Sequence, residues 1–147
     1  QFGKQDQGFL SMWLWRHLNK ISINYQGFGG HGYQIRDVLD ISDLCLLINE
    51  QIFKINKINN QTFNVGGGIK NAISLRELTN HCIKLTNNKV KIKKNLYTSN
   101  YDLRYYVTDN KKIYSKFKWR VIKSIKFIIS ETLVSLIKNK KHLQKIL

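Results

Sequence analysis

The chain has 147 residues, of which 42% are hydrophobic and 12% aromatic, so it can bury the core of one ordinary domain, which excludes wholesale disorder. Its net charge of +16 is concentrated after residue 80, where seventeen Lys and Arg stand against three Asp and Glu. No apolar run approaches the roughly 20 residues that a membrane-spanning helix needs, so no membrane partner is expected.

Hydrophobic periodicity predicts helices and short strands that alternate along the chain. In chain order they are a helix over residues 9–20, a strand over 21–25, a glycine-rich loop over 27–32, an extended run over 33–40, a helix over 41–53, a strand over 62–65, a helix from 74, short strands over 90–97 and 105–108, and one long or two shorter helices over 119–146. Asp40 or Ser42 is the expected N-cap of the second helix, and Ser74 with Glu77 has the form of a capping box. The pattern predicts the α+β class, with residues 1–147 forming a single domain.

The N-terminal residues and the two cysteines bear on the extent of the chain and on its cellular compartment. The first residues, Gln1-Phe2-Gly3-Lys4, are neither an initiator Met nor a secretory signal, which predicts that the chain is part of something longer. Cys45 and Cys82 fall in apolar segments without metal-ligand spacing. We interpret both as reduced core residues of a cytoplasmic protein.

Two literal motifs match cofactor-binding patterns but stand in the wrong context. Gly27, Gly29 and Gly32 fit GxGxxG, yet the dinucleotide fingerprint needs a helix after the loop, and the residues that follow look extended. A loop joining two strands is the better interpretation. Tyr114 and Lys118 fit YxxxK, but no nucleotide-binding pattern precedes them. No catalytic, cofactor-binding or metal-ligating residue is therefore predicted.

Anion binding is the chemistry that single residues suggest. Arg36 precedes Asp37 at the end of an extended run, where it could hold a diphosphate or form a local surface pair with that carboxylate. Asn64 stands beside three glycines and could donate to a phosphate or form a turn. Spacing alone leaves both choices open.

The Lys-rich second half offers an alternative of a different class. A basic surface of this kind can bind nucleic acid through its phosphates. However, the basic residues are nearly all Lys, scattered among Ile and Asn, with little Arg for bidentate contacts. A residue-usage bias explains this pattern as well, so no nucleic-acid partner is expected.

The order of four segments resembles one family. They are QFGKQDQG at residues 1–8, GFGGHGYQIRDVLDISDL at 27–44, FNVGGG at 63–68 followed by SLREL at 74–78, and DLRYYVTD at 102–109. Together they resemble the NAD-dependent epimerase/dehydratases, which are extended short-chain dehydrogenase/reductases, and most narrowly the CDP-paratose 2-epimerases, also called CDP-tyvelose epimerases. The resemblance implies the C-terminal substrate-binding portion of that fold, with the Rossmann core missing.

The resemblance also implies a function. Family members bind NAD and epimerise a nucleotide-diphosphate sugar by transient oxidation, at C2 of CDP-paratose in this branch; a 4-epimerase or dehydratase on the same scaffold is the alternative. NAD would be bound by the missing N-terminal half, so the chain alone is expected to be inactive, and its parent is expected to be a homo-oligomer.

Five residues become candidate substrate contacts through the resemblance. Arg36 would bind the diphosphate with help from Asn64, and Tyr25 and Asp102 would lie near the base and ribose. Relatives often carry a second phosphate-binding Arg three residues before the Asp, where Ser99 stands here. Arg104 is the candidate to compensate for it.

The missing half has a consequence for stability. The apolar face that packs on a Rossmann half would be exposed in this chain, and we expect the piece to be marginally stable or to oligomerise. Its expected members are Trp13, Trp15, Leu39 and Ile41.

Overall fold

The computed structural model describes residues 8–144, which divide into two compact units. The first unit comprises residues 8–34, 74–104 and 126–144, and the second comprises residues 35–73 and 105–125. Helices and short strands alternate in both, which confirms the α+β class. The single incomplete domain over residues 1–147 stays a prediction, and seven of the eight residues of the opening motif lie outside the described residues.

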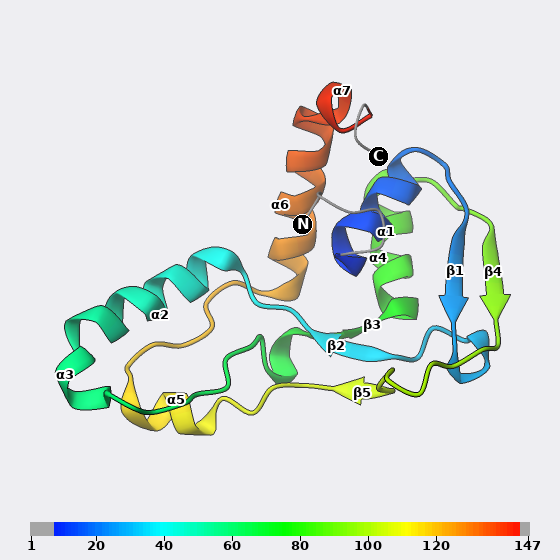
Figure 1. Cartoon of the computed structure of the whole chain (residues 1–147). Helices are drawn as coiled ribbons and strands as arrows, with labels where there is room; N and C mark the ends of the chain where they lie inside the picture. Colours follow the sequence, from blue (N-terminus) through cyan, green and yellow to red (C-terminus); the bar gives the residue numbers. More distant parts are fainter. Residues whose placement is uncertain (1–7, 145–147) are drawn as a thin grey trace. The chain divides into compact units, whose positions relative to one another are not determined.

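The first unit contains a small parallel sheet and several helices (Figure 1). Its elements are α1 (Phe9–Leu18), β1 (Ile23–Gln26), the 3-10 turn η1 (Phe28–Gly30), α4 (Leu75–Thr86), β4 (Ile92–Asn95), nearly all of α6 (Ile125–Lys138) and α7 (Lys140–Leu143). β1 pairs in parallel with β4, with Ile23 opposite Ile92, and α1 packs on α4. The predicted helix over 9–20 and the strands near 21–25 and 90–97 are confirmed, with bounds that differ by a few residues.

A polar group lies at the centre of the first unit's core. Trp13 and Tyr25 stack with ring centroids 6.3 Å apart, and each donates to Thr79 Oγ1, at 2.9 and 2.8 Å. Because all three are buried, these bonds satisfy polar atoms that water cannot reach. Trp13 and Trp15 are only 4% and 8% exposed, so their prediction as members of an open apolar face is wrong.

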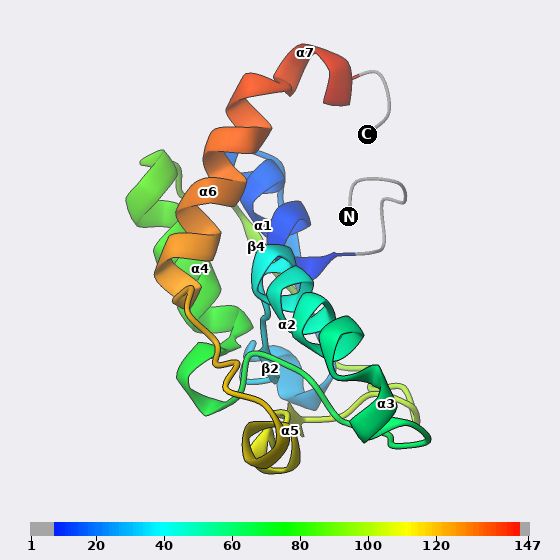
Figure 2. The same cartoon turned by 90° about the vertical axis from the view of Figure 1, so that its left-hand side faces the viewer.

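The second unit places the candidate anion-binding residue on the central strand of a three-stranded sheet. The sheet order is β3 (Ala72–Ser74), β2 (Ile35–Asp37), β5 (Tyr105–Tyr106), and β2 pairs in parallel with β5 so that Arg36 stands opposite Tyr106. The other elements are α2 (Ile41–Phe53), which continues into α3 (Ile55–Ile58) as Figure 2 shows, the 3-10 turn η2 (Ile69–Asn71) and α5 (Lys111–Lys116).

The core of the second unit joins α2 to the segment that follows α5. Leu47, Ile113, Phe117 and Trp119 are buried together, and partly buried side chains such as Phe63 pack against them. Ile48 is an apolar residue of the helix predicted over 41–53, but it is 44% exposed, whereas its neighbour Leu47 is buried. The apolar face of α2 is therefore wider than the part of it that packs against the core of this unit.

Three further predictions are corrected by the structure. Residues 62–65 form no strand, because no neighbouring strand among the described residues offers them a hydrogen-bonded ladder. Cys45 is exposed on α2, whereas Cys82 is buried as predicted. The helical region predicted to start at residue 119 starts later, since α6 begins at Ile125, and Ile122, which precedes it, is 71% exposed. Within residues 8–144, no helix has the length and apolarity to cross a membrane.

Candidate functional site

Arg36 is half-buried at the middle of the sheet in the second unit. Its Nη1 donates to the carbonyl oxygen of Ile35 at 2.8 Å, which uses one of the five N–H donors of the guanidinium. Because β2 is flanked on both sides by strands, the backbone beneath Arg36 is fixed. The role of Arg36 at a diphosphate stays a prediction.

Asp37 fixes the glycine segment rather than acting as a simple surface carboxylate. Its Oδ2 accepts a hydrogen bond from Gly68 N at 2.8 Å. A Cβ on Gly66 would overlap Asp37 Oδ2 and Thr108 Oγ1, and one on Gly67 would overlap the carbonyl oxygen of Val38. The close approach of these chains therefore requires glycine, which explains the triple glycine in physical terms.

Two buried asparagines hold the loops around the glycine segment. Asn110 accepts from Gly66 N at 3.2 Å and donates to Gly66 O at 2.8 Å, so one side chain pairs with both backbone groups. Asn71 donates to the carbonyls of Val38 and Lys123 and accepts from Ile125 N. Both side chains are at least 95% buried, and their hydrogen bonds make this part of the second unit rigid.

Asn64 precedes the glycine segment and has an exposed side chain. It lies in the same unit as Arg36, on the connection that leads to the loop held by Asp37. Its role at a phosphate stays a prediction.

The other three candidates belong to the first unit. Tyr25 is 6% exposed, and its hydroxyl donates to Thr79 Oγ1, so the phenol already has a structural partner. Asp102 is half-buried in a turn, where its backbone N donates to Ser99 O at 3.0 Å. Arg104 is exposed. Their roles as substrate contacts stay predictions.

The GxGxxG loop does not fit a dinucleotide. It leads into β2 rather than into a helix, and a Cβ on Gly32 would lie 2.9 Å from the Tyr25 ring, so the side chain of the preceding strand packs against this glycine. The carbonyl oxygen of Gly32 accepts a hydrogen bond from Arg76 N at 2.9 Å, so one backbone N–H at the start of α4 already has a partner. The interpretation as a loop between two strands is confirmed.

The YxxxK match also fails on geometry. α5 ends at Lys116 and Phe117 is extended, so Lys118 does not stand one helical turn from Tyr114. Tyr114 instead packs beneath the Arg120 guanidinium, 4.5 Å from the ring centroid. Within the described residues, neither of these two motifs therefore supplies a cradle for NAD or an acid/base Tyr–Lys pair. The described residues also contain no group of three or more His, Cys, Asp or Glu that could hold a metal.

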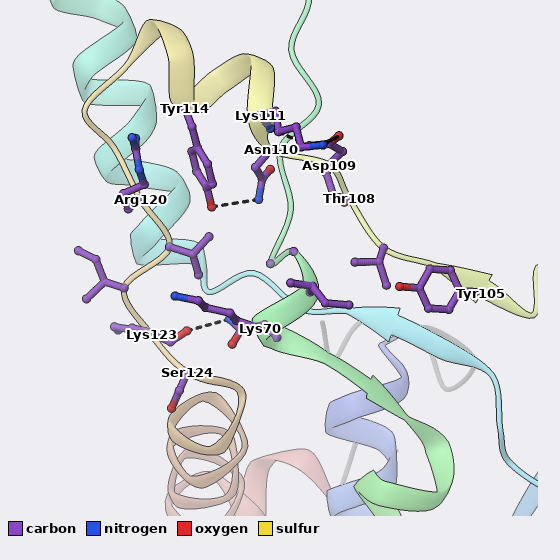
Figure 3. Close-up of a pocket in the computed structure, with 17 residues that line it drawn as sticks. Lys70, Tyr105, Thr108, Asp109, Asn110, Lys111, Tyr114, Arg120, Lys123 and Ser124 are labelled. Carbon is purple, nitrogen blue, oxygen red and sulfur yellow. Dashed lines mark hydrogen bonds and ion pairs between the residues drawn. The ribbon is translucent and has the colours of Figure 1, made fainter.

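A cavity of about 770 Å³ lies within the second unit (Figure 3). Its walls come from the η2 turn, the start of α5 and the segment between Trp119 and α6, and they bring together Lys70, Lys111, Arg120 and Lys123. Neither Arg36 nor Asn64 lines it. Sequence reasoning missed this cavity because its residues are ordinary Lys, Asn and Tyr that carry no motif; the buried Asn71 and Asn110 are the only signal, and burial of Asn cannot be read from one sequence.

One lining residue also forms an ion pair with a carboxylate. Lys123 Nζ lies 3.2 Å from Asp40 Oδ1, the N-cap carboxylate of α2, which also accepts from Ser42 N at 2.8 Å. Burial raises the pKa of Asp40, but the hydrogen bonds from Ser42 and Lys123 outweigh it, so the pKa lies below its ordinary value. Lys123 is therefore a paired cation.

A comparison with family models finds no match. Among curated proteins the chain is similar to CDP-paratose 2-epimerase from Salmonella typhi, with 33% identity over 121 residues that cover 81% of this chain and 36% of that protein. The chain thus spans little more than a third of the length of this relative.

Solved structures share the fold at low sequence identity. UDP-glucose 4-epimerase from Thermotoga maritima matches with a TM-score of 0.72 and 19% identity, covering 90% of this chain and 40% of that one. dTDP-glucose 4,6-dehydratase from Bacillus anthracis, in complex with NAD, matches with a TM-score of 0.73 and 18% identity, covering 96% and 42%. An epimerase from Methanothermobacter thermautotrophicus gives 0.76 at 13% identity, covering 95% and 40%.

Sequence and fold agree, since the curated relative and these structures are epimerases and a dehydratase of one scaffold, matched over about 40% of their length. The chain belongs to the NAD-dependent epimerase/dehydratases of the extended short-chain dehydrogenase/reductase family and corresponds to their C-terminal part.

Proposed function

We propose that this chain is the substrate-binding part of a nucleotide-sugar epimerase that acts on a CDP-sugar, with epimerisation of CDP-paratose at C2 as the specific reaction of the whole protein. The observation that supports this proposal is the 33% identity to CDP-paratose 2-epimerase over 121 residues. This match is higher than the identities of 13–19% to the structures compared above, which inform on the fold alone.

Arg36 carries the binding step in this proposal. Arg36 stands on the central strand of the sheet. A guanidinium can donate two parallel N–H bonds to two oxygens of a diphosphate, and such charge-assisted bonds are stronger than neutral ones. Asn64 adds a neutral donor from the same unit. Tyr25, Asp102 and Arg104 belong to the first unit, and their assignment to the nucleoside and the diphosphate rests on the family resemblance alone. Asp37 contributes indirectly, because its bond to Gly68 N keeps the glycine segment next to β2.

The chemical step lies outside the described residues. Oxidation and reduction of the sugar need a hydride carrier and an acid/base pair, and neither the GxGxxG loop nor Tyr114 fits those roles here. For this chain the proposal is therefore nucleotide-sugar binding without turnover.

A thermal-shift titration of the 147-residue chain with CDP, UDP and dTDP tests the proposal. CDP is expected to raise the melting temperature most, and Arg36→Ala to weaken CDP binding by about ten- to a hundredfold, the loss expected for a charge-assisted pair. Arg36→Lys keeps the positive charge but loses the two parallel N–H donors of the guanidinium, so it should bind CDP more tightly than Arg36→Ala but more weakly than the unsubstituted chain. Arg76→Ala, which removes the same charge from an exposed site on α4, is the control.

A second experiment restores the phosphate-binding arginine that the resemblance expects where Ser99 stands. If relatives place a second phosphate-binding Arg at this position, Ser99→Arg should tighten CDP binding, whereas Ser22→Arg in the same unit should not. Indifference of the unsubstituted chain to all three nucleotides would overturn the proposal.

A second candidate function is a 4-epimerase or a dehydratase on the same scaffold. The fold similarity to UDP-glucose 4-epimerase and to dTDP-glucose 4,6-dehydratase favours it. The same titration separates the two, since a preference for UDP or dTDP over CDP supports the alternative.

A further inference from the structure

The cavity of the second unit has walls that are fixed before any ligand arrives. The amide of Asn71 ties the η2 turn to Lys123 O and Ile125 N, at 2.8 and 2.9 Å. The amide of Asn110 ties the start of α5 to Gly66 and also donates to the Tyr114 hydroxyl at 3.3 Å. A cavity of about 770 Å³ with such walls has the size of a small-molecule site.

Positive charge exceeds negative charge among the lining residues. Four cations line the cavity against one carboxylate, Asp109. Lys111 lies 3.7 Å from Asp109 and Lys123 lies 3.2 Å from Asp40, so these two are compensated. Lys70 and Arg120 form no ion pair within residues 8–144, and they leave the cavity with two uncompensated positive charges.

Arg120 is held in a fixed orientation beside the cavity. Its Nη1 donates to the carbonyls of Phe117 and Trp119, at 3.0 and 2.6 Å, and its guanidinium stacks on the Tyr114 ring. The Nη2 and Nε donors have no acceptor among the described residues. Figure 3 shows Arg120 beside Tyr114 and Lys70 extending from the η2 turn on the opposite wall. Because little rotamer entropy remains to be lost, these donors are prepared for an anion.

The rest of the lining is apolar. Val107, Val121 and Ile122 line the cavity together with the Tyr105 ring, and Ile122 and Tyr105 are 71% and 56% exposed. Solvent-exposed apolar side chains next to two cations suit a ligand that has an apolar ring at one end and a doubly charged anionic group at the other. A phosphate monoester carries about two negative charges at neutral pH.

We propose that this cavity binds a small phosphate monoester that carries a ring, with Lys70 and Arg120 on the phosphate and the apolar wall on the ring. The site is separate from the nucleotide-sugar site of the proposed function, since Arg36 and Asn64 do not line it. The proposal does not rest on that function.

A titration of the ¹⁵N-labelled 147-residue chain with phenyl phosphate, followed by NMR, tests the proposal. Backbone amide shifts are expected at Gly68, Lys70, Asn71 and Asn110. Lys70→Ala is expected to weaken binding by about tenfold, as for loss of one charge-assisted contact. Lys70 is exposed, so its removal should leave the fold intact. Arg120→Gln should weaken binding similarly and is the second variant, because Arg120 also packs on Tyr114.

Two controls separate this site from others. Lys116→Ala removes the same charge from an exposed position on α5 that does not line the cavity, and Arg36→Ala removes the nucleotide-sugar contact; both should leave phenyl phosphate affinity unchanged. Inorganic phosphate should bind more weakly than phenyl phosphate. Equal affinity for the two ligands, shifts centred on β2, or full affinity in Lys70→Ala would each overturn the proposal.

Discussion

Asp43 shows how a single carboxylate organises the second unit. It is 1% exposed on α2, and its Oδ2 accepts from the backbone N of both Ile122 and Lys123, each at 3.0 Å. Its backbone carbonyl accepts from Trp119 Nε1. One residue thus positions the segment that carries Arg120 and lines the cavity.

Loss of the Asp43 carboxylate is predicted to destabilise the chain. Asp43→Ala removes a buried carboxylate and leaves the backbone N–H groups of Ile122 and Lys123 without this acceptor, at an expected cost of about 3 kcal/mol. Asp43→Asn retains one acceptor oxygen, since both bonds end on the same atom, and should cost about 1 kcal/mol. Glu50→Ala, on the same helix in a long ion pair, is the control at about 0.5 kcal/mol or less. Urea unfolding measures all three, and equal costs for Asp43→Ala and Glu50→Ala would contradict this role.

Protonation of the buried His17 is predicted to lower the free energy of unfolding in mild acid. It is fully buried in α1, with Nδ1 2.7 Å from Trp13 O, and its Nε2 has no hydrogen-bond partner among residues 8–144. Burial lowers the pKa of His17 below 6.5, and the bond to Trp13 only partly offsets it. The unfolded chain therefore binds a proton before the folded chain does, so stability falls as the pH drops from 6.5 to the folded pKa.

Unfolding in urea at pH 7.5 and 5.5 measures this effect. The unsubstituted chain should lose stability between these values, and His17→Gln should lose less. Asp40 and Glu77 do not interfere, because their ordinary pKa values of 3.8 and 4.5 lie below the window and their folded values are lower still. An unchanged pH dependence in His17→Gln would show that another group is responsible.

At the scale of the elements, the N-terminus of α4 has the predicted capping box, and its contribution to the free energy of unfolding can be measured. Ser74 Oγ accepts from Glu77 N while the Glu77 carboxylate accepts from Ser74 N at 2.9 Å, so the capping box predicted from the sequence is confirmed. Ser74→Ala is expected to cost about 1 kcal/mol. Asn80→Ala, at an exposed position of the same helix, should change stability by less than about 0.5 kcal/mol.

The Ser74 hydrogen bonds also predict a pH dependence. They lower the pKa of Glu77, so the folded carboxylate resists protonation and contributes stability that is lost as the pH falls below 4.5. Ser74→Ala should therefore reduce the acid sensitivity of unfolding below pH 4.5. Equal sensitivity in the two chains would contradict the assignment.

Elements with local signals were predictable, and those that depend on distant partners were not. α2 begins and ends at the predicted residues because Asp40 caps it and its apolar residues repeat at helical spacing. The extended run at 62–65 has strand composition, but a strand exists only where a partner pairs with it. β3, with three residues, and α5, with six, are too short to carry a periodic signal.

The same distinction applies to the site. The local context of Arg36 left a diphosphate contact and a surface ion pair open, and the family resemblance made it a candidate. The structure places it on a central strand, and its role in binding stays a prediction. The second use of Asp37, as an acceptor for Gly68 N, joins residues 31 positions apart and leaves no local trace in the sequence. The cavity is assembled from three separate segments, so its cations were indistinguishable from the many solvated Lys of this chain.

At the scale of the whole molecule, α2 and α3 expose more apolar surface than a folded chain usually leaves in water. Phe53 is 82% exposed, Ile52 61%, Ile55 59% and Leu46 50%, and Ile41 at the start of α2 is 71% exposed as predicted. Exposed apolar residues that follow one another along a helix mark a surface that associates with another apolar surface. The chain covers 36% of the length of its curated relative, so it presents this surface without the remainder of such a protein.

We therefore predict concentration-dependent self-association of the 147-residue chain. Phe53→Glu places a charge where the most exposed aromatic of α2 stands and should shift the population toward monomer, because burying an unpaired carboxylate costs several kcal/mol. Asn49→Glu adds the same charge at an exposed polar position of the same helix and should leave association unchanged. Light scattering after size exclusion, over a tenfold range of concentration, measures the effect. A monodisperse monomer at every concentration, in the unsubstituted chain, would show that this face needs no partner.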